Sequence, residues 1–375
     1  MRRVLHVIPD LTLGGAERFV LELARWQKHS GTAIPRLCVF GSPGTSMAAE
    51  GERLGAVFLR ARKVNAPFRT STLRRLMKVS REFQPDVLHS HLWPAALAGA
   101  VVSQMLRLKH VVHIQDTRPF LRSQDMKSRL RRHLYRNLLS RSNARYIAVS
   151  RCARDFTASP MRINEREIEV IPNGINPEVF DSPPNTEQRA TRRTGVVIGA
   201  AGRLVPDKGF EDLIVAVGAL CREFPRLVLK IAGSGSHLSV LQQLATRTGM
   251  SPHIQWLGRV DDMKTFYSGC DLFVLPSRGH EGMPIVVLEA MASGVPVVAT
   301  RCAGVDEAIQ DGREGILVPL RNTTELSLAI SRLAGDGLLR RRMGDAASKA
   351  ARSFLIPDIG SRINDVYAHL HQPYH

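Results

Sequence analysis

The sequence predicts an α/β protein of two domains, each built on a parallel β-sheet that helices cover. Three observations predict this fold. Short apolar runs, which suit strands buried on both faces, alternate along the chain with segments whose apolar residues recur at helical spacing. The chain has 375 residues, which is enough for two domains. A polar, proline-bearing segment at 181–195 separates two groups of apolar runs and is typical of a linker.

The elements follow from these runs in chain order. Before the linker, strands are expected over 4–8, 36–40, 55–59, 86–89, 110–114, 145–149 and 168–171. After the linker, they are expected over 196–200, 227–232, 254–257, 271–275, 295–299 and 316–318. A helix is expected directly after the first strand of each group, at about Glu17–His29 and over Phe210–Leu220. Ligands of open parallel sheets bind at the carboxyl ends of the strands, so the loops that follow the strands are the candidate sites.

The loop after the first strand contains Gly14 and Gly15, just before the expected helix. Two glycines allow the backbone to approach a phosphate closely at a helix start. The spacing is not the G-x-G-x-x-G dinucleotide fingerprint, so a Rossmann dehydrogenase is not indicated.

A second candidate phosphate site is the loop Gly199–Gly209, which reads G-A-A-G-R-L-V-P-D-K-G. Arg203 offers a guanidinium with bidentate donors and Lys208 a compact point charge, a combination that suits a diphosphate. Solvated loop cations that bind nothing are the competing interpretation.

The segment 277–293 holds two carboxylates, Glu281 in a Gly-rich loop and Glu289 in the helix expected after it. Pro284 suits the first position of that helix, and the free backbone N–H groups before it form an anion site. Carboxylates repel phosphate but accept hydrogen bonds from the hydroxyl groups of a ribose or a sugar. An ordinary strand-turn-helix with an exposed Glu is the alternative.

No metal site is expected. His89 and His91 could chelate an ion, but no third ligand is near them, and neither zinc-ligand spacing nor a D-x-D motif occurs. The five cysteines are scattered without a C-x-x-C pair, which favours reduced, buried thiols.

Together these motifs resemble the retaining glycosyltransferases of family 4, which have the GT-B fold of two facing Rossmann-like domains. Each motif alone is weak, but their order and spacing over nearly the whole chain are specific. Met283 departs from the pattern, because many members carry an aromatic or other apolar residue there. The resemblance is carried by G-G-A-E-R at 14–18, H-S-H at 89–91, I-P-N-G-I at 171–175, G-R-L-V-P-D-K-G at 202–209, and E-G-M-P with the second Glu at 281–289.

The resemblance implies the division of labour between the domains. Residues 1–180 would bind the acceptor, and residues 196–357 would bind the nucleotide-sugar donor. The last helix, expected at about Asp358–His371 within the segment 358–375, would pack back on the first domain.

The resemblance also implies roles for individual residues. Glu289 would accept hydrogen bonds from the donor ribose and Glu281 from the transferred sugar, while His113, near the end of an expected strand, would lie beside that sugar. The nucleobase would rest against the backbone of Arg259 and Val260. The donor diphosphate would be held by Gly15, Arg203, Lys208, Gly282, Met283, Pro284 and Ile285. Acceptor contacts would come from Gly14, Arg18 and His91.

The net charge of +18 is concentrated in the first half of the chain. Residues 1–180 contain 30 Lys and Arg against 14 Asp and Glu, whereas residues 181–375 contain 22 against 20. The basic residues cluster in 60–81 and 118–145, and the second cluster has nine of them against Asp125 alone. Apolar residues at helical spacing make it a basic amphipathic segment that suits an anionic membrane surface; these are Leu130, Leu134, Tyr135 and Leu138.

Two alternatives for the basic half remain, namely a plain basic surface and a nucleic-acid interface. Nucleic acid is disfavoured because the aromatic residues are not interleaved with the arginines.

The sequence therefore predicts a retaining, metal-independent hexosyltransferase. It would use a nucleotide-sugar co-substrate, with UDP favoured on family frequency, and a saccharide or lipid-linked acceptor of surface polysaccharide biosynthesis. No run of eighteen apolar residues and no signal peptide is seen, so a cytoplasmic place on the inner face of the membrane is expected. A sugar-nucleotide epimerase on the same fold, a non-catalytic scaffold and a nucleic-acid-binding protein are the alternatives.

Overall fold

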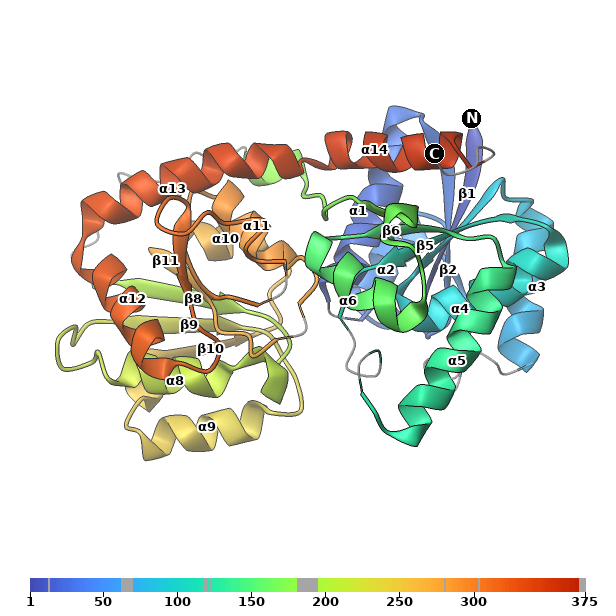
Figure 1. Ribbon diagram of the computed structural model, residues 1–375. Coiled ribbons are helices and arrows are strands. Elements are labelled where there is room, and N and C mark those ends of the chain that lie inside the picture. Colours follow the sequence, from blue (N-terminus) through green and yellow to red (C-terminus); the bar gives the residue numbers. More distant parts are fainter. Residues whose placement is uncertain are drawn as a thin grey trace. The chain divides into compact units, whose positions relative to one another are not determined.

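The computed structural model describes residues 1–12, 14–61, 70–117, 121, 123–180, 195–279, 281–302 and 304–370 (Figure 1). The chain forms two compact units. Unit 1 comprises Met1–Gly174 and Ile356–His375, and unit 2 comprises Ile175–Leu355. The linker expected at 181–195 lies outside the described residues except for Gly195.

Unit 1 is built on a parallel sheet of seven strands in the order β3-β2-β1-β4-β5-β6-β7. All seven strands expected in this half are confirmed. The strand expected over 86–89 continues through Ser90 and His91, because both residues are buried despite their polarity. The strands are β1 (Arg2–Ile8), β2 (Ala33–Val39), β3 (Val57–Phe58), β4 (Val87–His91), β5 (Lys109–Ile114), β6 (Arg145–Ala148) and β7 (Ile168–Val170).

Helices cover both faces of this sheet. Leu5, Val7 and Leu88 face one side, where they share a core with α3 and α4. Helices α1 and α14 pack against each other, and a Cβ added to Gly360 of α14 would meet the Trp26 ring at 2.4 Å. The helices of unit 1 are α1 (Gly15–Ser30), α2 (Ser46–Arg53), α3 (Thr70–Phe83), α4 (Leu92–Leu106), α5 (Met126–Arg141), α6 (Arg151–Met161) and α14 (Ile356–Ala368).

Unit 2 is built on a parallel sheet of six strands in the order β10-β9-β8-β11-β12-β13, and the six strands expected here are confirmed. They are β8 (Val197–Ala201), β9 (Val228–Ala232), β10 (Ile254–Gly258), β11 (Leu272–Leu275), β12 (Val297–Thr300) and β13 (Gly315–Val318). The helices are α8 (Phe210–Gly218), α9 (Leu238–Arg247), α10 (Met263–Ser268), α11 (Ile285–Ala292), α12 (Thr323–Gly335) and α13 (Gly337–Ala351). Helices α8, α9 and α12 contribute to the main core, whereas α11 packs between the sheet and α13 (Figure 1).

Both sheets have a point where the strand order reverses. In unit 1, β1 lies between β2 and β4, and in unit 2, β8 lies between β9 and β11. At such a switch point the loops after the two central strands diverge and leave a crevice at their carboxyl ends. The candidate loops after β1, β4, β8 and β11 are therefore placed where α/β proteins bind ligands.

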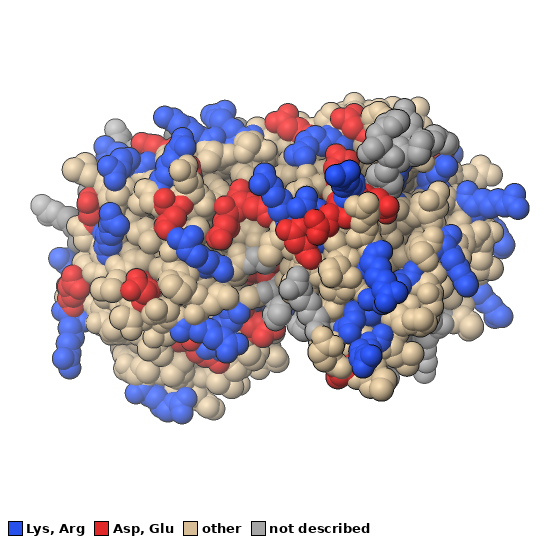
Figure 2. Space-filling model, in the orientation of Figure 1, with Lys and Arg blue, Asp and Glu red and all other residues tan. Residues whose placement is uncertain are grey.

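The basic segment expected at 118–145 contains helix α5, whose N-terminus is capped by Asp125. Its apolar residues divide between two faces. Tyr135 is buried with Leu139, whereas Leu130 is 68% and Leu134 43% exposed. Figure 2 shows basic side chains with few acidic ones on this part of unit 1. The exposed cations of the helix are Lys127, Arg129, Arg131 and Arg141.

Among the described residues, no helix combines the length and apolarity that crossing a membrane would require.

Candidate functional site

In unit 2 the two predicted loops lie against each other at the switch point. The backbone N–H of Arg278, after β11, donates to the carbonyl of Asp207, after β8, at 2.9 Å. The Arg278 guanidinium also donates to both oxygens of Asp212 at 2.8 and 2.7 Å. These hydrogen bonds raise the pKa of Arg278, so the cation that joins the loops stays charged.

Gly209 allows this close approach. Its φ is +67°, and a Cβ built there would meet the carbonyl oxygen of Pro276 at 2.0 Å. A side chain at this position would push the loop after β8 away from the loop after β11.

Lys208 and Glu281, which the sequence assigns to different loops, form an ion pair. The Lys208 Nζ donates to Glu281 Oε1 at 2.5 Å, and the Ser277 hydroxyl donates to the same oxygen at 2.5 Å. Glu281 is 7% exposed, so its carboxylate is held in place by two donors in a largely dry setting. The structure thus brings a predicted diphosphate cation and a predicted sugar carboxylate into contact.

Glu289 lies in α11, one turn beyond the helix start. It is 3% exposed, and its Oε2 accepts a hydrogen bond from the Tyr267 hydroxyl at 3.1 Å. Pro284 is the N-cap of α11 rather than its first helical residue, because the helix begins at Ile285. Gly282 and Met283 precede it and are buried. The backbone N–H groups expected to hold an anion are therefore at the start of α11.

The other predicted donor residues lie on neighbouring loops of unit 2. Arg203 is exposed on the loop after β8. Arg259 and Val260 follow β10 at the edge of the sheet, and the Arg259 Nε donates to Asp261 at 3.1 Å. Burial and the nearby Glu281 carboxylate raise the pKa of the Cys302 thiol to about 12, so this thiol is not a nucleophile at neutral pH.

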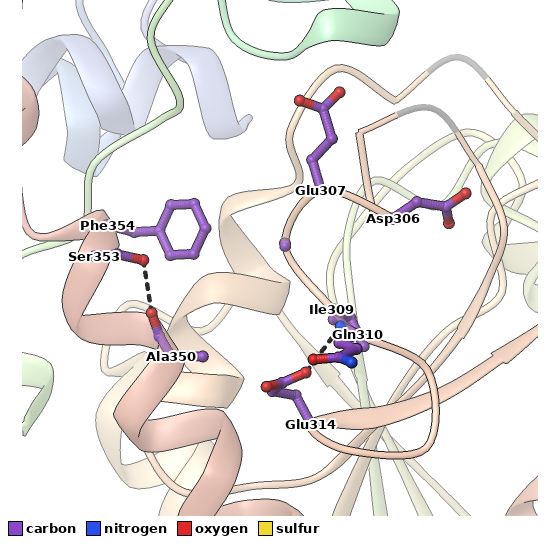
Figure 3. Close-up of a pocket in the computed structure, with 9 residues that line it drawn as sticks. Asp306, Glu307, Ile309, Gln310, Glu314, Ala350, Ser353 and Phe354 are labelled. Carbon is purple, nitrogen blue, oxygen red and sulfur yellow. Dashed lines mark hydrogen bonds between the residues drawn. The ribbon is translucent and has the colours of Figure 1, made fainter.

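A separate pocket of about 340 Å³ lies elsewhere in unit 2 (Figure 3). Asp306 and Glu307 project from one of its loops, and Glu314 accepts a hydrogen bond from the backbone N–H of Gln310 at 2.8 Å. None of the predicted donor residues lines it. Three carboxylates make this pocket unsuited to a diphosphate, so it does not compete with the loops at the switch point.

In unit 1, the loop after β1 leads into α1 through Gly14, the N-cap. A Cβ on Gly14 would meet the Glu17 carboxylate at 2.1 Å, so the glycine leaves room for that side chain. Gly15 is exposed, and Arg18 is partly buried one turn into the helix.

The predicted histidines of unit 1, His89, His91 and His113, come together with His6 in a group here called the histidine cluster. His6 is the register partner of His89, and His91 is the partner of His113, so all four lie on the same face of β1, β4 and β5. Their ring centroids are 4.2 to 5.4 Å apart in the pairs that touch. Each is at most 1% exposed.

The cluster corrects the expectation that His89 and His91 have no third ligand near them. His6 Nδ1 lies 3.1 Å from His91 Nε2, and one nitrogen from each of His6, His89 and His91 lies within 4.8 Å of the other two. His6 was not predicted as a partner of these residues, because it is 83 positions from His89 in the chain. The available signal was that both are in the two strands that flank the switch point.

Burial keeps these rings neutral. Desolvation lowers the pKa of His6 to about 4, although the hydrogen bond from its ring to Gln27 acts in the opposite direction. Desolvation also lowers the pKa of His113 to about 3. The pKa values of His89 and His91 are also lowered well below the usual value, chiefly by burial. His113 is thus a neutral, covered ring, and contact with a sugar needs a local rearrangement.

Gln115 is a polar residue that the sequence analysis did not single out. It follows β5 directly, is 8% exposed, and its side-chain oxygen and nitrogen have no hydrogen-bond partner among the described residues. A buried primary amide without partners is poised to bind a hydroxyl group at the carboxyl end of this strand.

Comparison with known proteins agrees with this geometry. A family model described as Glycosyltransferase Family 4 matches residues 13–179, and one described as Glycosyl transferases group 1 matches residues 181–350. The uncharacterized glycosyltransferase MJ1607 of Methanocaldococcus jannaschii is 31% identical over 277 residues, which cover 70% of each chain. The phosphatidyl-myo-inositol mannosyltransferase of Mycobacterium leprae is 28% identical over 94% of this chain and 92% of that protein.

Solved structures show the same fold. The Anabaena protein Alr3699/HepE, crystallised with UDP-glucose, has a TM-score of 0.83 at 22% identity, covering 98% of this chain and 100% of that chain. The sucrose-phosphate synthase of Thermosynechococcus elongatus has a TM-score of 0.81 at 18% identity, covering 98% and 99%. With two parallel-sheet units, two successive family models and a relative at 31% identity, the chain belongs to family 4 of the glycosyltransferases and has the GT-B fold.

Proposed function

We propose that this glycosyltransferase moves a hexose or N-acetylhexosamine from a UDP-sugar to a saccharide or lipid-linked saccharide, with retention of configuration and without a metal at the diphosphate. The observation that carries the proposal is the meeting of the Lys208 loop and the Glu281 loop at the switch point of unit 2. The Anabaena structures that contain UDP and UDP-glucose support the choice of donor, and the mannosyltransferase relative supports a lipid-linked acceptor.

The donor is proposed to lie over the loops of unit 2. Arg203, Lys208 and the N–H groups of residues 282–285 hold the diphosphate, since helix-start N–H groups and fixed cations both favour an anion. Glu289 accepts from the ribose hydroxyls and Glu281 from the sugar hydroxyls. Lys208 donates to Glu281 at 2.5 Å in this structure. It would therefore lie between the diphosphate, which it is proposed to hold, and the sugar, whose hydroxyls Glu281 is proposed to bind.

The transfer step is proposed to occur on one face of the sugar. The acceptor oxygen bonds to the anomeric carbon on the side from which the diphosphate departs, while the bond from that carbon to the diphosphate oxygen breaks with its electron pair. The acceptor proton passes to the leaving phosphate oxygen. Arg203, Lys208 and the start of α11 stabilise the growing negative charge more than the ground state, so no metal is needed there.

Unit 1 is proposed to bind the acceptor. The family resemblance places His113 beside the transferred sugar and Gly14, Arg18 and His91 on the acceptor side, with Gly15 near the diphosphate. Because His91 and His113 are at most 1% exposed, we propose that their effect passes through Gln115 and the loop at the carboxyl end of β5.

A transfer assay over several nucleotide sugars tests the proposal. Release of UDP from one UDP-sugar, stimulated by a lipid-linked saccharide and unchanged by EDTA, is the expected result. Lys208→Ala should reduce the rate by about 100-fold or more, as loss of a charge-stabilising donor does. The matched control is Arg247→Ala, an exposed cation on α9. Turnover that requires a GDP-sugar, or none with any donor, would overturn the proposal.

We further propose that α5 docks on an anionic membrane. Met126, Leu130 and Leu134 are 76%, 68% and 43% exposed and recur every four residues, so they form an apolar stripe between the cations of this helix. Each cation near such a surface contributes roughly 1 kcal/mol.

Vesicle co-sedimentation tests this docking. Replacing Lys127, Arg129 and Arg131 with Gln should weaken binding to vesicles with anionic lipid about 100-fold, at roughly 1 kcal/mol for each cation. The matched control replaces three exposed arginines of unit 2, which are Arg332 of α12 and Arg341 and Arg342 of α13. Equal binding to neutral vesicles would contradict the proposal.

A further inference from the structure

We infer that His6, His89 and His91 of unit 1 form a binding site for one divalent transition-metal ion, zinc in the first place, that stabilises this unit. The inference does not rest on the proposed transfer reaction, because it is argued from the geometry of the cluster alone, although His91 is also assigned to the acceptor side there. It concerns ligands from two neighbouring strands, β1 and β4.

The spacing of the nitrogens suits one ion. Two imidazole nitrogens on one tetrahedral zinc ion lie roughly 3.3 Å apart, given Zn–N distances of about 2.0–2.1 Å. His6 Nδ1 and His91 Nε2 are 3.1 Å apart, and the His89 nitrogen lies within 4.8 Å of the other two ligand atoms. Small side-chain rotations therefore bring three nitrogens to a common centre.

The outer hydrogen bonds suit the tautomers that a metal needs, since the contact of His6 fixes its tautomer and the contact of His89 is compatible with the required one. His6 Nε2 donates to the Gln27 side-chain oxygen at 2.9 Å, which leaves His6 Nδ1 with a free lone pair. His89 Nδ1 lies 2.6 Å from the Tyr367 hydroxyl, and with its proton on that side it leaves Nε2 as the ligand. A ligating histidine characteristically uses its other nitrogen in this way, to an oxygen that orients the ring.

The same cluster contains buried nitrogens that nothing in the described residues satisfies. His89 Nε2 and His91 Nδ1 have no hydrogen-bond partner, and neither nitrogen of the adjacent His113 has one. Four orphaned nitrogens in one buried cluster are costly if the cluster is only packing. A metal ion removes the cost at His89 Nε2 and replaces the single His6–His91 hydrogen bond with two coordination bonds.

The surroundings favour an imidazole-preferring ion over Mg²⁺ or Ca²⁺. Three neutral imidazoles and no carboxylate form the ligand set, which suits zinc, cobalt, nickel or copper. Because the three rings have no exposed surface, the ion would enter during folding and exchange slowly afterwards. The Gln27 and Tyr367 contacts connect the site to α1 and α14, so the ion would hold four elements together.

The first experiment measures metal content in the full-length chain, made without an affinity tag of histidines. We expect one zinc per chain after expression or refolding with zinc, kept against EDTA in the folded protein and released in denaturant. Co²⁺ loaded by refolding should give the strong visible absorption of a tetrahedral nitrogen site. Fewer than about 0.2 equivalents after both treatments, or a pale octahedral Co²⁺ spectrum, would overturn the inference.

Variants locate the ion. His6→Asn and His89→Asn should each lose the bound zinc, and Tyr367→Phe should weaken it about 10- to 100-fold, as loss of an orienting partner does. The matched control is His110→Asn, a buried histidine of the same unit that lies outside the trio, which should keep one equivalent. Retention of zinc by the His89 variant would refute the site. Loss of zinc from a full-length chain carrying His371→Asn and His375→Asn would also refute it, because the ion would then depend on histidines outside the trio. If the trio variants do not fold, the cobalt spectrum of the unaltered chain decides the question.

Discussion

At the scale of single residues, the two glutamates of unit 2 differ in their surroundings. Glu281 is held by a cation and a hydroxyl, whereas Glu289 is held by the Tyr267 hydroxyl inside a helix. Both are buried, but the first lies on the loop before α11 and the second one turn into that helix. Different partners predict different effects of removal.

We therefore expect Glu289→Ala to weaken donor binding and Glu281→Ala to slow transfer. Loss of a charge-assisted hydrogen bond costs about 1.5–3 kcal/mol, so the Kd of the donor for the Glu289 variant should rise roughly 10- to 150-fold. The kcat of the Glu281 variant should fall about 100-fold or more. Calorimetry and initial rates measure the two, with Glu223→Ala, an exposed carboxylate, as the control. Loss of binding alone in both variants would contradict the division of roles.

A second residue-scale prediction concerns pH. Burial lowers the pKa of His110 to about 3, and its ring contacts the hydroxyls of Ser90 at 2.9 Å and Ser142 at 3.4 Å. In the unfolded chain the pKa is about 6.5. Between these values the unfolded state binds one more proton than the folded state, so His110 lowers stability as the pH falls from about 6.5 towards 3, and has no such effect above pH 7.5.

Replacing His110 with Asn removes this proton uptake. In buffer that contains a chelator, the unfolding free energy of the variant should fall less steeply with acidification, by about 1.4 kcal/mol per pH unit between pH 6 and 4. Urea unfolding monitored in unit 1 at several pH values measures the slope. Parallel slopes for the two proteins would show that the residue does not titrate in this way.

At the scale of elements, the donor site depends on how closely two loops approach. Gly209 and Gly249 both have positive φ, +67° and +70°, but only Gly209 would place a Cβ against backbone, at 2.0 Å from the Pro276 oxygen. Nothing lies within 4 Å of a Cβ at Gly249. A comparison of alanine substitutions at these two glycines therefore separates the cost of backbone strain from the cost of a steric clash.

We expect Gly249→Ala to cost about 1–2 kcal/mol of stability, as alanine does in the left-handed region. Gly209→Ala should cost about 1–3 kcal/mol more, as overpacking does, and should also weaken donor binding because it displaces Lys208. Urea unfolding and donor calorimetry measure both effects. Equal stabilities and unchanged donor affinity in the two variants would mean that the loops tolerate separation.

The sequence predicted the strands better than the contacts between them. All thirteen strands were predicted, because short apolar runs mark the strands of a parallel sheet, including an edge strand such as β10 that is partly exposed. The pairing of Lys208 with Glu281 was not, because it depends on a sheet order that brings residues 73 positions apart together. The contact of His6 with His89 and His91 was not predicted for the same reason. Motif resemblance named the donor residues individually, whereas only the register of β1, β4 and β5 could show that four histidines share one face.

At the scale of the whole molecule, the chain begins and ends in unit 1. Helix α14 follows the last residue of unit 2 directly and packs on α1. Its polar contacts reach three other elements of the unit, through Tyr367 to His89 at 2.6 Å, Asn364 to Gln27 at 3.4 Å and Arg362 to the Val170 carbonyl at 2.7 Å. Helix α14 is therefore an integral part of unit 1, although it follows unit 2 in the chain.

This arrangement predicts which unit loses stability when a buried side chain of α14 is shortened. Ile363 of α14 is fully buried, so Ile363→Ala should destabilise by about 2–5 kcal/mol, a large share of the usual 5–15 kcal/mol of a domain. Although residue 363 follows unit 2 in the sequence, the loss should appear in unit 1. Hydrogen exchange should therefore accelerate in β1, β4 and β5 and stay unchanged in β8 and β11. The control is Leu338→Ala on α13, where the side chain is 80% exposed and the expected change is within about 0.5 kcal/mol. Faster exchange in β8 and β11 instead would mean that α14 stabilises the unit it follows in the chain and not the one it packs against.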